Sequence, residues 1–463
     1  MRRKEATVMK KLVIILAMLA LTVPAQAGHH GKARNGKGGK LPHDRIKNII
    51  VMISDGCGYN QIDAASLYQY GRTGQQVYEH FPVRLGMSTY MDGGQYDPAA
   101  AWKDFDYVKS GATDSAAAAT TMSAGEKTYS GAIGVDVNGE PLTHAIEWAE
   151  ARGMATGVVT SVEFSHATPA GFVAHNVSRN NYAAIANEMI YESALEVIMG
   201  AGAPDFDNDG NPSEKDAKYV GGPATFNDLS DDLKVMGADA DGDGLADAWQ
   251  VIRTREDFKA MAKGPTPRRL IGLPFVYQTL QQSRSNAPYA APYAVPLIES
   301  VPTLEEMTRA ALNVLDDDED GFFLMVEGGA VDWAGHANQS GRVIEEEIDF
   351  NRSVEAVMAW VKKNSNWGET LLIVTGDHET GYLNGPEDDT ANPTWEDLVN
   401  NGEGVLPGMG WHSGDHTNQL IPFFAKGSAA RLFKSEIAGE DPVRGRYIDN
   451  TAVGLVLIDI LSK

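Results

Sequence analysis

A serine hydroxyl at the start of a predicted helix is the first feature of this 463-residue chain that could do chemistry. Within residues 110–125, SGATDSAAAATTMSAG, Ser115 directly follows Asp114 and opens a run of Ala and Thr. A serine or acid before such a run is usually a helix N-cap. The backbone N–H groups of a helix N-terminus can also face a phosphate. Serine is a poor nucleophile unless a base or a metal activates it, so a catalytic role for Ser115 depends on other residues.

Carboxylate and imidazole side chains occur at metal-ligand spacings in the second half of the chain. Asp332 and His336 are four residues apart, one helical turn, so both could bind one ion. Asp377 precedes His378 directly, and His416 adds a further imidazole. Oxygen and imidazole ligands without thiolates suit zinc, with magnesium at any all-oxygen site. Each pair alone is more typical of a cap or a surface feature. Together they predict a two-metal site, an arrangement suited to in-line displacement at phosphorus.

Alternating strand and helix patterns would position these residues. Five short apolar runs bounded by turn residues predict buried strands: Asn48–Ile53, Ala155–Ser161, Gly321–Val326, Thr370–Thr375 and Ile421–Ala425. Helical patterns lie between them: Thr143–Arg152, Asn181–Met199, Thr303–Leu315 and Arg342–Lys363. Such alternation predicts an α/β fold, with a large, mostly parallel central sheet and helices on both faces.

The candidate ligands come directly after the predicted strands. The first run ends at Asp55, the third at Glu327 and the fourth at Asp377–His378, while the second continues towards His166 and Thr168. In open parallel sheets, ligands bind beyond the carboxyl ends of the strands. We therefore expect these residues, far apart in sequence, to meet at one edge of the sheet.

The ends of the chain predict an exported protein. Residues 1–27 have a basic start, an apolar stretch and the cleavage pattern Ala25-Gln26-Ala27 of a secretory signal peptide. The apolar stretch is too short for a stable membrane anchor, which needs about 20 residues. We expect a flexible linker at 28–47 and a single catalytic domain at 48–463, with insertions at about 201–300 and 381–414. The predicted location is periplasmic or secreted.

Composition narrows the classes of partner. The chain is 43% hydrophobic and 22% charged, as in a globular protein, and its formal net charge of -24 disfavours nucleic-acid binding. The single cysteine, Cys57, rules out an internal disulfide, and we interpret it as a packing residue. The apolar stretch Ala452–Leu461 predicts a closing helix or strand.

The set of motifs resembles the alkaline phosphatase family of metal-dependent phosphomonoesterases. The resemblance runs from about Lys47 to Gly427, outside the expected insertions. Its strongest pieces are Asp55-Gly56, Asp114-Ser115-Ala116, His166-Ala167-Thr168-Pro169-Ala170, Glu327-Gly328-Gly329, Asp332 with His336, Thr375-Gly376-Asp377-His378 and His416-Thr417.

The resemblance implies a role for each matching residue. Ser115 would be the nucleophile that becomes phosphoserine, and Arg179 would clamp two phosphate oxygens, which a guanidinium does in bidentate fashion. The implied ligands are Asp332, His336 and His416 for a first zinc, Asp55, Asp377 and His378 for a second zinc, and Asp55, Thr168 and Glu327 for magnesium. Bound cations would also make the pocket attractive to phosphate monoesters within an acidic protein. The resemblance further implies a homodimer.

Two positions depart from the best-known bacterial pattern of the family. His166 stands where some members carry Asp, as in animal-type and some marine bacterial relatives, so we expect the third metal to be held more weakly. Trp333 stands where some members carry Lys. It could offer its indole N–H to phosphate, or it could only pack.

Other readings stay open on the sequence alone. A phosphodiesterase or sulfatase of the same metal superfamily is one, although the chain lacks a sulfatase-type Cys-x-Pro-x-Arg. Acidic turns at 205–210 and 239–247 resemble the start of calcium loops but lack a closing glutamate, so an exported calcium-binding or adhesion protein is another. His412 rivals His416 as a zinc ligand. We expect His43, His80, His144 and His175 to be structural.

Overall fold

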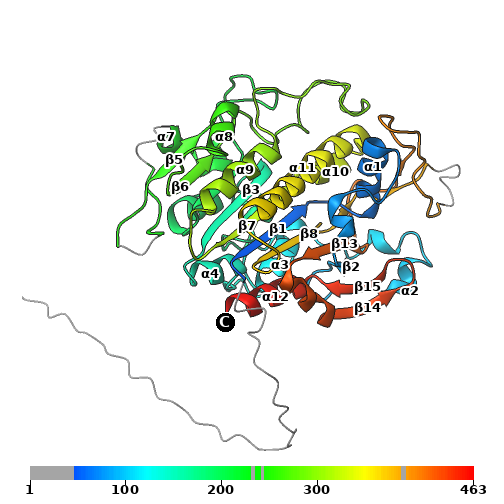
Figure 1. Cartoon of the computed structure of the whole chain (residues 1–463). Coiled ribbons are helices and arrows are strands. Elements are labelled where there is room, and N and C mark those ends of the chain that lie inside the picture. The colour runs from blue at the N-terminus through cyan, green and yellow to red at the C-terminus, as the bar shows by residue number, and fades with distance from the viewer. Residues whose placement is uncertain (1–45, 231–234, 241–243, 387–392) are drawn as a thin grey trace, which may run out of the picture. The chain divides into compact units, whose positions relative to one another are not determined.

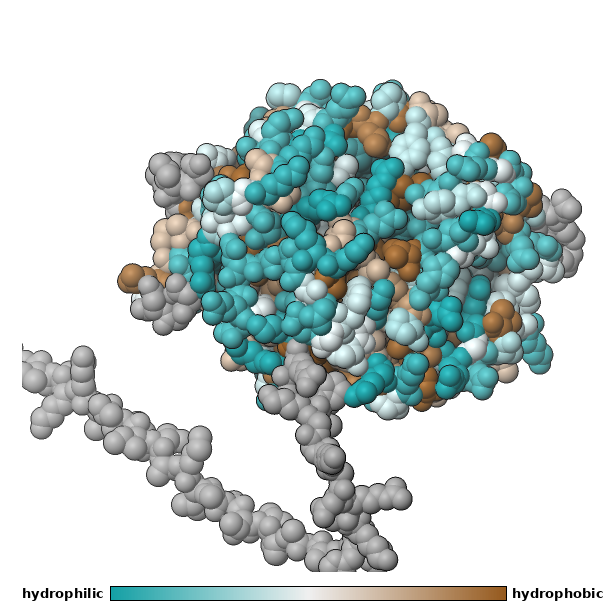
Figure 2. Space-filling model, viewed as in Figure 1, coloured by the Kyte–Doolittle hydropathy of each residue, from teal (hydrophilic) through white to brown (hydrophobic). Residues whose placement is uncertain are grey.

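The computed structural model of the chain describes residues 46–230, 235–240, 244–386 and 393–463. The predicted signal peptide and nearly all of the predicted linker lie outside these residues. Within them, no helix has both the length and the hydropathy that crossing a membrane requires. Figure 2 shows a face of the molecule on which hydrophilic residues predominate and hydrophobic ones occur in small, scattered groups.

One large sheet runs through the described part of the chain, beside two small two-stranded sheets, and confirms the predicted fold class (Figure 1). In sheet order its 11 strands are β14 (Ile437–Asp441), β15 (Gly445–Asp449), β2 (Val83–Ser88), β13 (Ile421–Lys426), β8 (Thr370–Thr375), β1 (Asn48–Ser54), β7 (Phe322–Gly328), β3 (Ala155–Glu163), β4 (Val197–Ala201), β6 (Arg269–Gly272) and β5 (Trp249–Ile252). From β8 to β5 all neighbours are parallel, whereas β13 is antiparallel to both of its neighbours. The sheet is therefore mixed at one side and parallel in its centre.

All five predicted strands are present, as β1, β3, β7, β8 and β13. Their long apolar runs arise because the sheet is covered on both faces, so successive side chains are buried on opposite sides. In β1, Ile49, Val51 and Ile53 belong to one hydrophobic core, and Ile50 and Met52 belong to the other. The strands β5 and β6, in the region expected as an insertion, extend the parallel edge.

Helices complete the two outer layers (Figure 1). One core contains apolar residues of α3 (Ser115–Ala124), α4 (Ala145–Glu150), α6 (Tyr182–Asn187) and α12 (Thr451–Leu461). The other contains residues of α8 (Arg255–Met261), α9 (Leu304–Leu315), α10 (Ala330–His336) and α11 (Ser340–Asn364). The closing stretch at 452–461 is thus helical, one of the two predicted alternatives.

One predicted helix is wrong in its second half. The pattern at Asn181–Met199 is α6 followed by a π-helical turn, η4 (Glu188–Glu192), and then by the strand β4. The run from Val197 to Ala201 carries no polar side chain because β4 is buried between β3 and β6. A short run of this kind carries no periodicity that separates a buried strand from a buried helix.

Candidate active site

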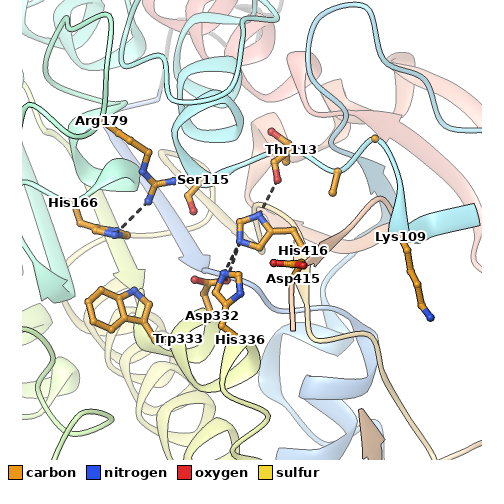
Figure 3. A pocket seen from close by; sticks show the side chains of 12 residues that line it. Lys109, Thr113, Ser115, His166, Arg179, Asp332, Trp333, His336, Asp415 and His416 are labelled. Carbon is orange, nitrogen blue, oxygen red and sulfur yellow. Dashed lines mark hydrogen bonds and ion pairs between the residues drawn. The ribbon is translucent and has the colours of Figure 1, made fainter. Parts of the chain in front are cut away.

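The carboxyl ends of the central parallel strands meet at one edge of the sheet, as the sequence predicts. Strand register pairs Ile53 of β1 with Glu327 of β7 and with Thr375 of β8. Asp55 and Asp377 therefore lie just beyond neighbouring strand ends. A cavity of about 710 Å³ opens there (Figure 3). Its lining includes Lys109, Thr113, Ser115, His166, Arg179, Asp332, Trp333, His336, Asp415 and His416.

Ser115 is the first residue of α3, and its side chain faces this cavity (Figure 3). The preceding Asp114 is the N-cap, with Oδ1 accepting a hydrogen bond from the Ala117 N–H at 3.1 Å. Ser115 is buried, and its Oγ lies 3.2 Å from Nε2 of His378. The N-cap reading of this stretch therefore applies to Asp114, while Ser115 is directed at the candidate ligands.

A first group of candidate ligands consists of Asp332, His336 and His416. Nε2 of His336 and Nε2 of His416 lie 3.0 Å apart, and Asp332 Oδ1 lies 3.5 and 3.3 Å from them. The other ring nitrogen of each histidine faces a backbone carbonyl, Gly414 at 2.6 Å and Thr113 at 2.8 Å. Nδ1–H donation to a carbonyl leaves Nε2 free to bind a cation, as is usual for metal-ligating histidines.

A second group lies deeper, around Asp55, Asp377 and His378. Nε2 of His378 is 3.4 Å from Asp55 Oδ1 and 3.3 Å from Asp377 Oδ2. Both Asp55 oxygens and Asp377 Oδ2 are buried and make no hydrogen bond to any described residue. Buried carboxylates need a charged or hydrogen-bonding partner, so these oxygens fit a divalent cation.

The third group is formed by Asp55, His166 and Glu327. Glu327 Oε2 accepts a hydrogen bond from Thr160, but Glu327 Oε1, His166 Nδ1 and Thr168 Oγ1 have no hydrogen-bond partner among the described residues. A set made mainly of unpaired oxygen atoms suits magnesium. All implied ligands thus occur in three adjacent groups, with Asp55 shared between two of them.

The three ligand groups bring several carboxylates together in a buried place, and without cations their negative charges repel one another. Burial, followed by repulsion from Asp377, raises the pKa of Asp55 well above its ordinary value. Burial likewise raises the pKa of Asp377 to about 6 and that of Glu327 to about 7. Burial also opposes a charge on Asp332 and on His416, but their mutual hydrogen bond and attraction prevail. The pKa of Asp332 is lowered, and that of His416 is raised to about 9.

Arg179 reaches the same cavity from the opposite side to His336 (Figure 3). Its Nη1 forms an ion pair with Asp114 Oδ2 at 3.0 Å, and its Nη2 lies 3.3 Å from Nε2 of His166. Burial, followed by the charge of Arg179, lowers the pKa of His166 to about 3, so neutral His166 accepts this hydrogen bond. The Trp333 ring lies edge-on to His166, 5.7 Å away between centroids.

Several supporting residues carry no sequence signal that would have identified them. Thr380 donates from Oγ1 to Asp332 Oδ1 at 2.5 Å, and Thr160 supports Glu327. Gly56 has a φ of +75°, and a Cβ there would lie 2.6 Å from Asp332 Cα. The Asp55-Gly56 motif is therefore required by both backbone conformation and close approach.

The remaining candidates lie elsewhere. The ring of His412 packs 5.0 Å from Phe105 and 5.8 Å from Tyr382 between centroids, outside the three ligand groups, so His416 is the better placed of the two rivals. In the first acidic turn, Asp205 forms an ion pair with Arg253 at 2.6 Å. In the second turn, residues 241–243 lie outside the described part.

Comparison with known proteins agrees with this geometry. The alkaline phosphatase family profile matches residues 46–404. Alkaline phosphatase 3 of Bacillus subtilis is 32% identical over 80% of this chain and 70% of its own length. The structure of a cold-active alkaline phosphatase from Shewanella is 26% identical with a TM-score of 0.62, covering 90% of this chain and 100% of that one. A histidine-to-aspartate variant of the TAB5 alkaline phosphatase, with Mg bound in its M3 site, is 24% identical with a TM-score of 0.60, covering 90% of this chain and 98% of that one. The chain therefore belongs to the alkaline phosphatase family of phosphomonoester hydrolases.

Proposed function

We propose that this phosphomonoesterase works through a phosphoserine on Ser115, at a site for two zinc ions and one magnesium ion. The observation that carries the proposal is the position of Ser115 Oγ, 3.2 Å from Nε2 of His378. The same nitrogen lies next to Asp55 and Asp377, whose carboxylates include oxygens that make no hydrogen bond to the described residues. A hydroxyl at this point would share a cation with those carboxylates. Such a cation would lower the pKa of the hydroxyl, and a cation in the neighbouring ligand group would stabilise the leaving oxygen.

The three ligand groups carry the proposed metal assignment. Asp332, His336 and His416 would hold the first zinc, because their imidazole and carboxylate donors suit that ion. Asp55, Asp377 and His378 would hold the second zinc. Asp55, Glu327 and Thr168, with His166 beside them, would hold magnesium, because these donors are mainly oxygen atoms.

The protein groups have distinct parts in the proposed reaction. Ser115 Oγ forms a bond to phosphorus as the bond to the ester oxygen breaks, and water then attacks phosphorus from the same side as the departed alcohol while Oγ leaves. Arg179 offers two N–H groups to two non-bridging oxygens, and the N-terminus of α3 faces the developing charge. Asp114 keeps Arg179 directed at this position through the ion pair between them. Trp333, at the rim, would contact the bound phosphate or pack against the ester group.

We also propose that magnesium is held weakly. His166 is neutral where a carboxylate would add a negative charge, and Arg179 lies 3.3 Å from it. The TAB5 alkaline phosphatase variant with aspartate in place of a histidine has Mg bound in its M3 site, so an aspartate-bearing relative of this fold can hold that ion.

Export to the periplasm or the medium and assembly as a homodimer are further proposals. Export rests on the signal pattern of residues 1–27, and dimerisation rests on the family resemblance. Calcium binding by the acidic turns stays a prediction. The contact of Asp205 with Arg253 leaves that carboxylate less available for a cation.

Replacement of Ser115 by Ala tests the central proposal. Loss of the nucleophile should lower turnover of an aryl phosphate by roughly 10³-fold or more. The zinc content should stay at the wild-type level, because the carboxylate and imidazole ligands are intact. Ser110→Ala, an exposed position in the preceding loop, is the matched control and should keep wild-type turnover. Turnover of Ser115→Ala within about tenfold of wild type would exclude Ser115 as the nucleophile.

Relative rates on different esters test the substrate class. A phosphate monoester should be hydrolysed much faster than a diester or a sulfate ester with the same leaving group. Arg179 is placed to hold two free oxygens of a monoester, whereas a diester carries a second substituent on one of them. Equal or faster diester hydrolysis would favour the phosphodiesterase alternative.

A further inference from the structure

A second histidine cluster lies outside the active-site cavity, against the helix α4. His144 is the N-cap of α4, and Glu147 is the third residue of that helix. His175 comes from the segment after α5 (Ala167–Ala170). One potential ligand atom from each of the three residues lies within 4.8 Å of the others. The sequence interpretation of these two histidines as merely structural did not anticipate this contact.

His144 is the unusual member of the cluster. Its side chain is 1% exposed, and neither ring nitrogen makes a hydrogen bond to any described residue. The nearest carboxylate oxygen, Glu147 Oε2, lies 3.5 Å from Nδ1. A buried polar group without a hydrogen-bond partner is destabilising, so its burial requires an explanation. Burial, followed by the neighbouring His175, lowers the pKa of His144 to about 3, which keeps a nitrogen lone pair available.

His175 has the hydrogen bonding of a metal ligand. Its Nδ1 lies 3.2 Å from Glu188 Oε1, which also accepts the His175 backbone N–H at 2.9 Å. Donation from Nδ1 to this carboxylate would leave a lone pair on Nε2. That nitrogen lies 3.8 Å from Glu147 Oε2 and 3.0 Å from the Leu142 carbonyl oxygen. Because both oxygens only accept, Nε2 either carries a proton that it donates to Leu142 O or gives its lone pair to a metal ion. Burial opposes a charge on His175, but the hydrogen bonds to Glu188 and Leu142 O prevail and raise its pKa, as expected for an imidazole that faces negative partners.

The surroundings favour the entry of a cation. A cavity of about 260 Å³ adjoins the cluster, and its lining includes Glu147, Glu150, Glu188 and Glu192 together with both histidines. Burial raises the pKa of Glu150 to about 7, and the neighbouring Glu147 carboxylate also contributes to this rise. The cluster shares no residue with the three groups of the active site.

We propose that His144, Glu147 and His175 form an additional metal site for a borderline divalent cation such as zinc. Two imidazoles and one carboxylate match the ligand preferences of zinc. Leu142 O is near enough to complete the set, and Glu188 orients His175 from outside it. The site would connect α4 to the segment that leads to Arg179. The backbone N–H of Arg179 also holds this segment in place, because it donates a hydrogen bond to Gly131 O at 2.8 Å.

Zinc stoichiometry of the purified enzyme tests this site. Wild-type protein equilibrated with zinc and then dialysed should hold one equivalent more than Glu147→Gln. In the wild-type protein the His144 backbone N–H donates a hydrogen bond to Glu147 Oε2 at 3.0 Å. The side-chain oxygen of glutamine can accept the same bond, so the start of α4 should be preserved in the variant. Glu150→Gln, in the same cavity but outside the cluster, should retain wild-type zinc. Glu188→Gln should weaken zinc binding at this site by roughly 10- to 100-fold.

Two further measurements separate this site from the active site. Aryl phosphate turnover should be equal in wild type, Glu147→Gln and Glu150→Gln, which would show that the catalytic metals are retained. Anomalous diffraction at the zinc edge from wild-type crystals should give a peak among His144, Glu147 and His175. Equal zinc in wild type and Glu147→Gln, with no anomalous peak beside His144, would overturn the proposal and leave a protonated His175 as the cation.

Discussion

At the scale of single residues, the active site depends on side chains that each perform two tasks. Asp114 caps α3 through Oδ1 and holds Arg179 through Oδ2, so the helix that presents Ser115 and the proposed phosphate clamp share one carboxylate. His166 accepts from Arg179 through Nε2, and its Nδ1 makes no hydrogen bond to the described residues. A substitution of Asp114 should therefore affect both the start of α3 and the position of Arg179. A substitution of His166 should affect both Arg179 and the third ligand group.

His166→Asp should strengthen magnesium binding at the third group. A unit negative charge about 4 Å from a divalent cation is worth well over 1.4 kcal/mol even at an effective dielectric constant of 20, so affinity should rise about tenfold or more. Equilibrium dialysis against graded magnesium, with metal analysis of the protein, measures this. His166→Asn supplies an oxygen ligand without charge and should give a smaller gain. Equal magnesium affinity in wild type and His166→Asp would contradict the placement of His166 beside this ion.

At the scale of secondary structure, the long helix α11 buries an unusual series of acids. Glu345, Glu346 and Glu347 are all buried. Glu347 accepts hydrogen bonds from Ser54 at 2.7 Å and from Tyr78 at 3.1 Å, and Glu345 pairs with Arg284 at 2.8 Å. Glu346 Oε1 makes no hydrogen bond to the described residues, and burial, followed by repulsion from Asp349 and Glu345, raises the pKa of Glu346 to about 8.

Glu346→Gln should therefore stabilise the protein at alkaline pH. The folded-state pKa lies above the ordinary value of 4.5, so the wild-type residue favours folding while it is protonated and loses that contribution as the pH rises towards 8. Glutamine mimics the protonated form at every pH. The free energy of unfolding of the variant relative to wild type should be at least about 1 kcal/mol higher at pH 8 than at pH 5, since one pKa unit corresponds to about 1.4 kcal/mol. Denaturant unfolding at the two pH values measures this, and an unchanged difference would show that Glu346 is ionised in the folded state at both.

The elements also show what sequence can and cannot predict. The central strands were predictable because each is a long apolar run that ends at a polar residue such as Asp55 or Asp377. The strands β14, β15 and β2 at one side of the sheet were not predicted, because partly exposed strands with mixed polarity give no such run. Residues that support the ligands through one hydrogen bond, such as Thr380, follow from tertiary packing, which no local pattern encodes.

At the scale of the whole molecule, a strongly acidic protein concentrates further acids at the site of an anionic substrate. The formal net charge is -24, and Asp55, Glu327, Asp332 and Asp377 are all buried around one cavity edge. Such an arrangement is tolerable only with divalent cations or with protons on some of the carboxylates. Metal ions and protons therefore compete for the same side chains. Removal of the metal should change how the free energy of unfolding depends on pH.

In the metal-free protein, the stability of the fold should decrease as the pH rises from 6.5 to 8.5. In the metal-free protein Glu327 has a pKa of about 7 and His416 one of about 9, both above their ordinary values of 4.5 and 6.5. The folded state thus retains protons that the unfolded chain has already lost, and stability declines as these protons dissociate, by on the order of 2 kcal/mol. With zinc and magnesium bound, the same ligands are already deprotonated, so stability should be nearly constant or should rise over this range. Thermal unfolding at pH 6.5 and 8.5, in chelator and in zinc with magnesium, compares the two slopes. Parallel slopes would show that metal does not bind at the groups that carry the raised pKa values.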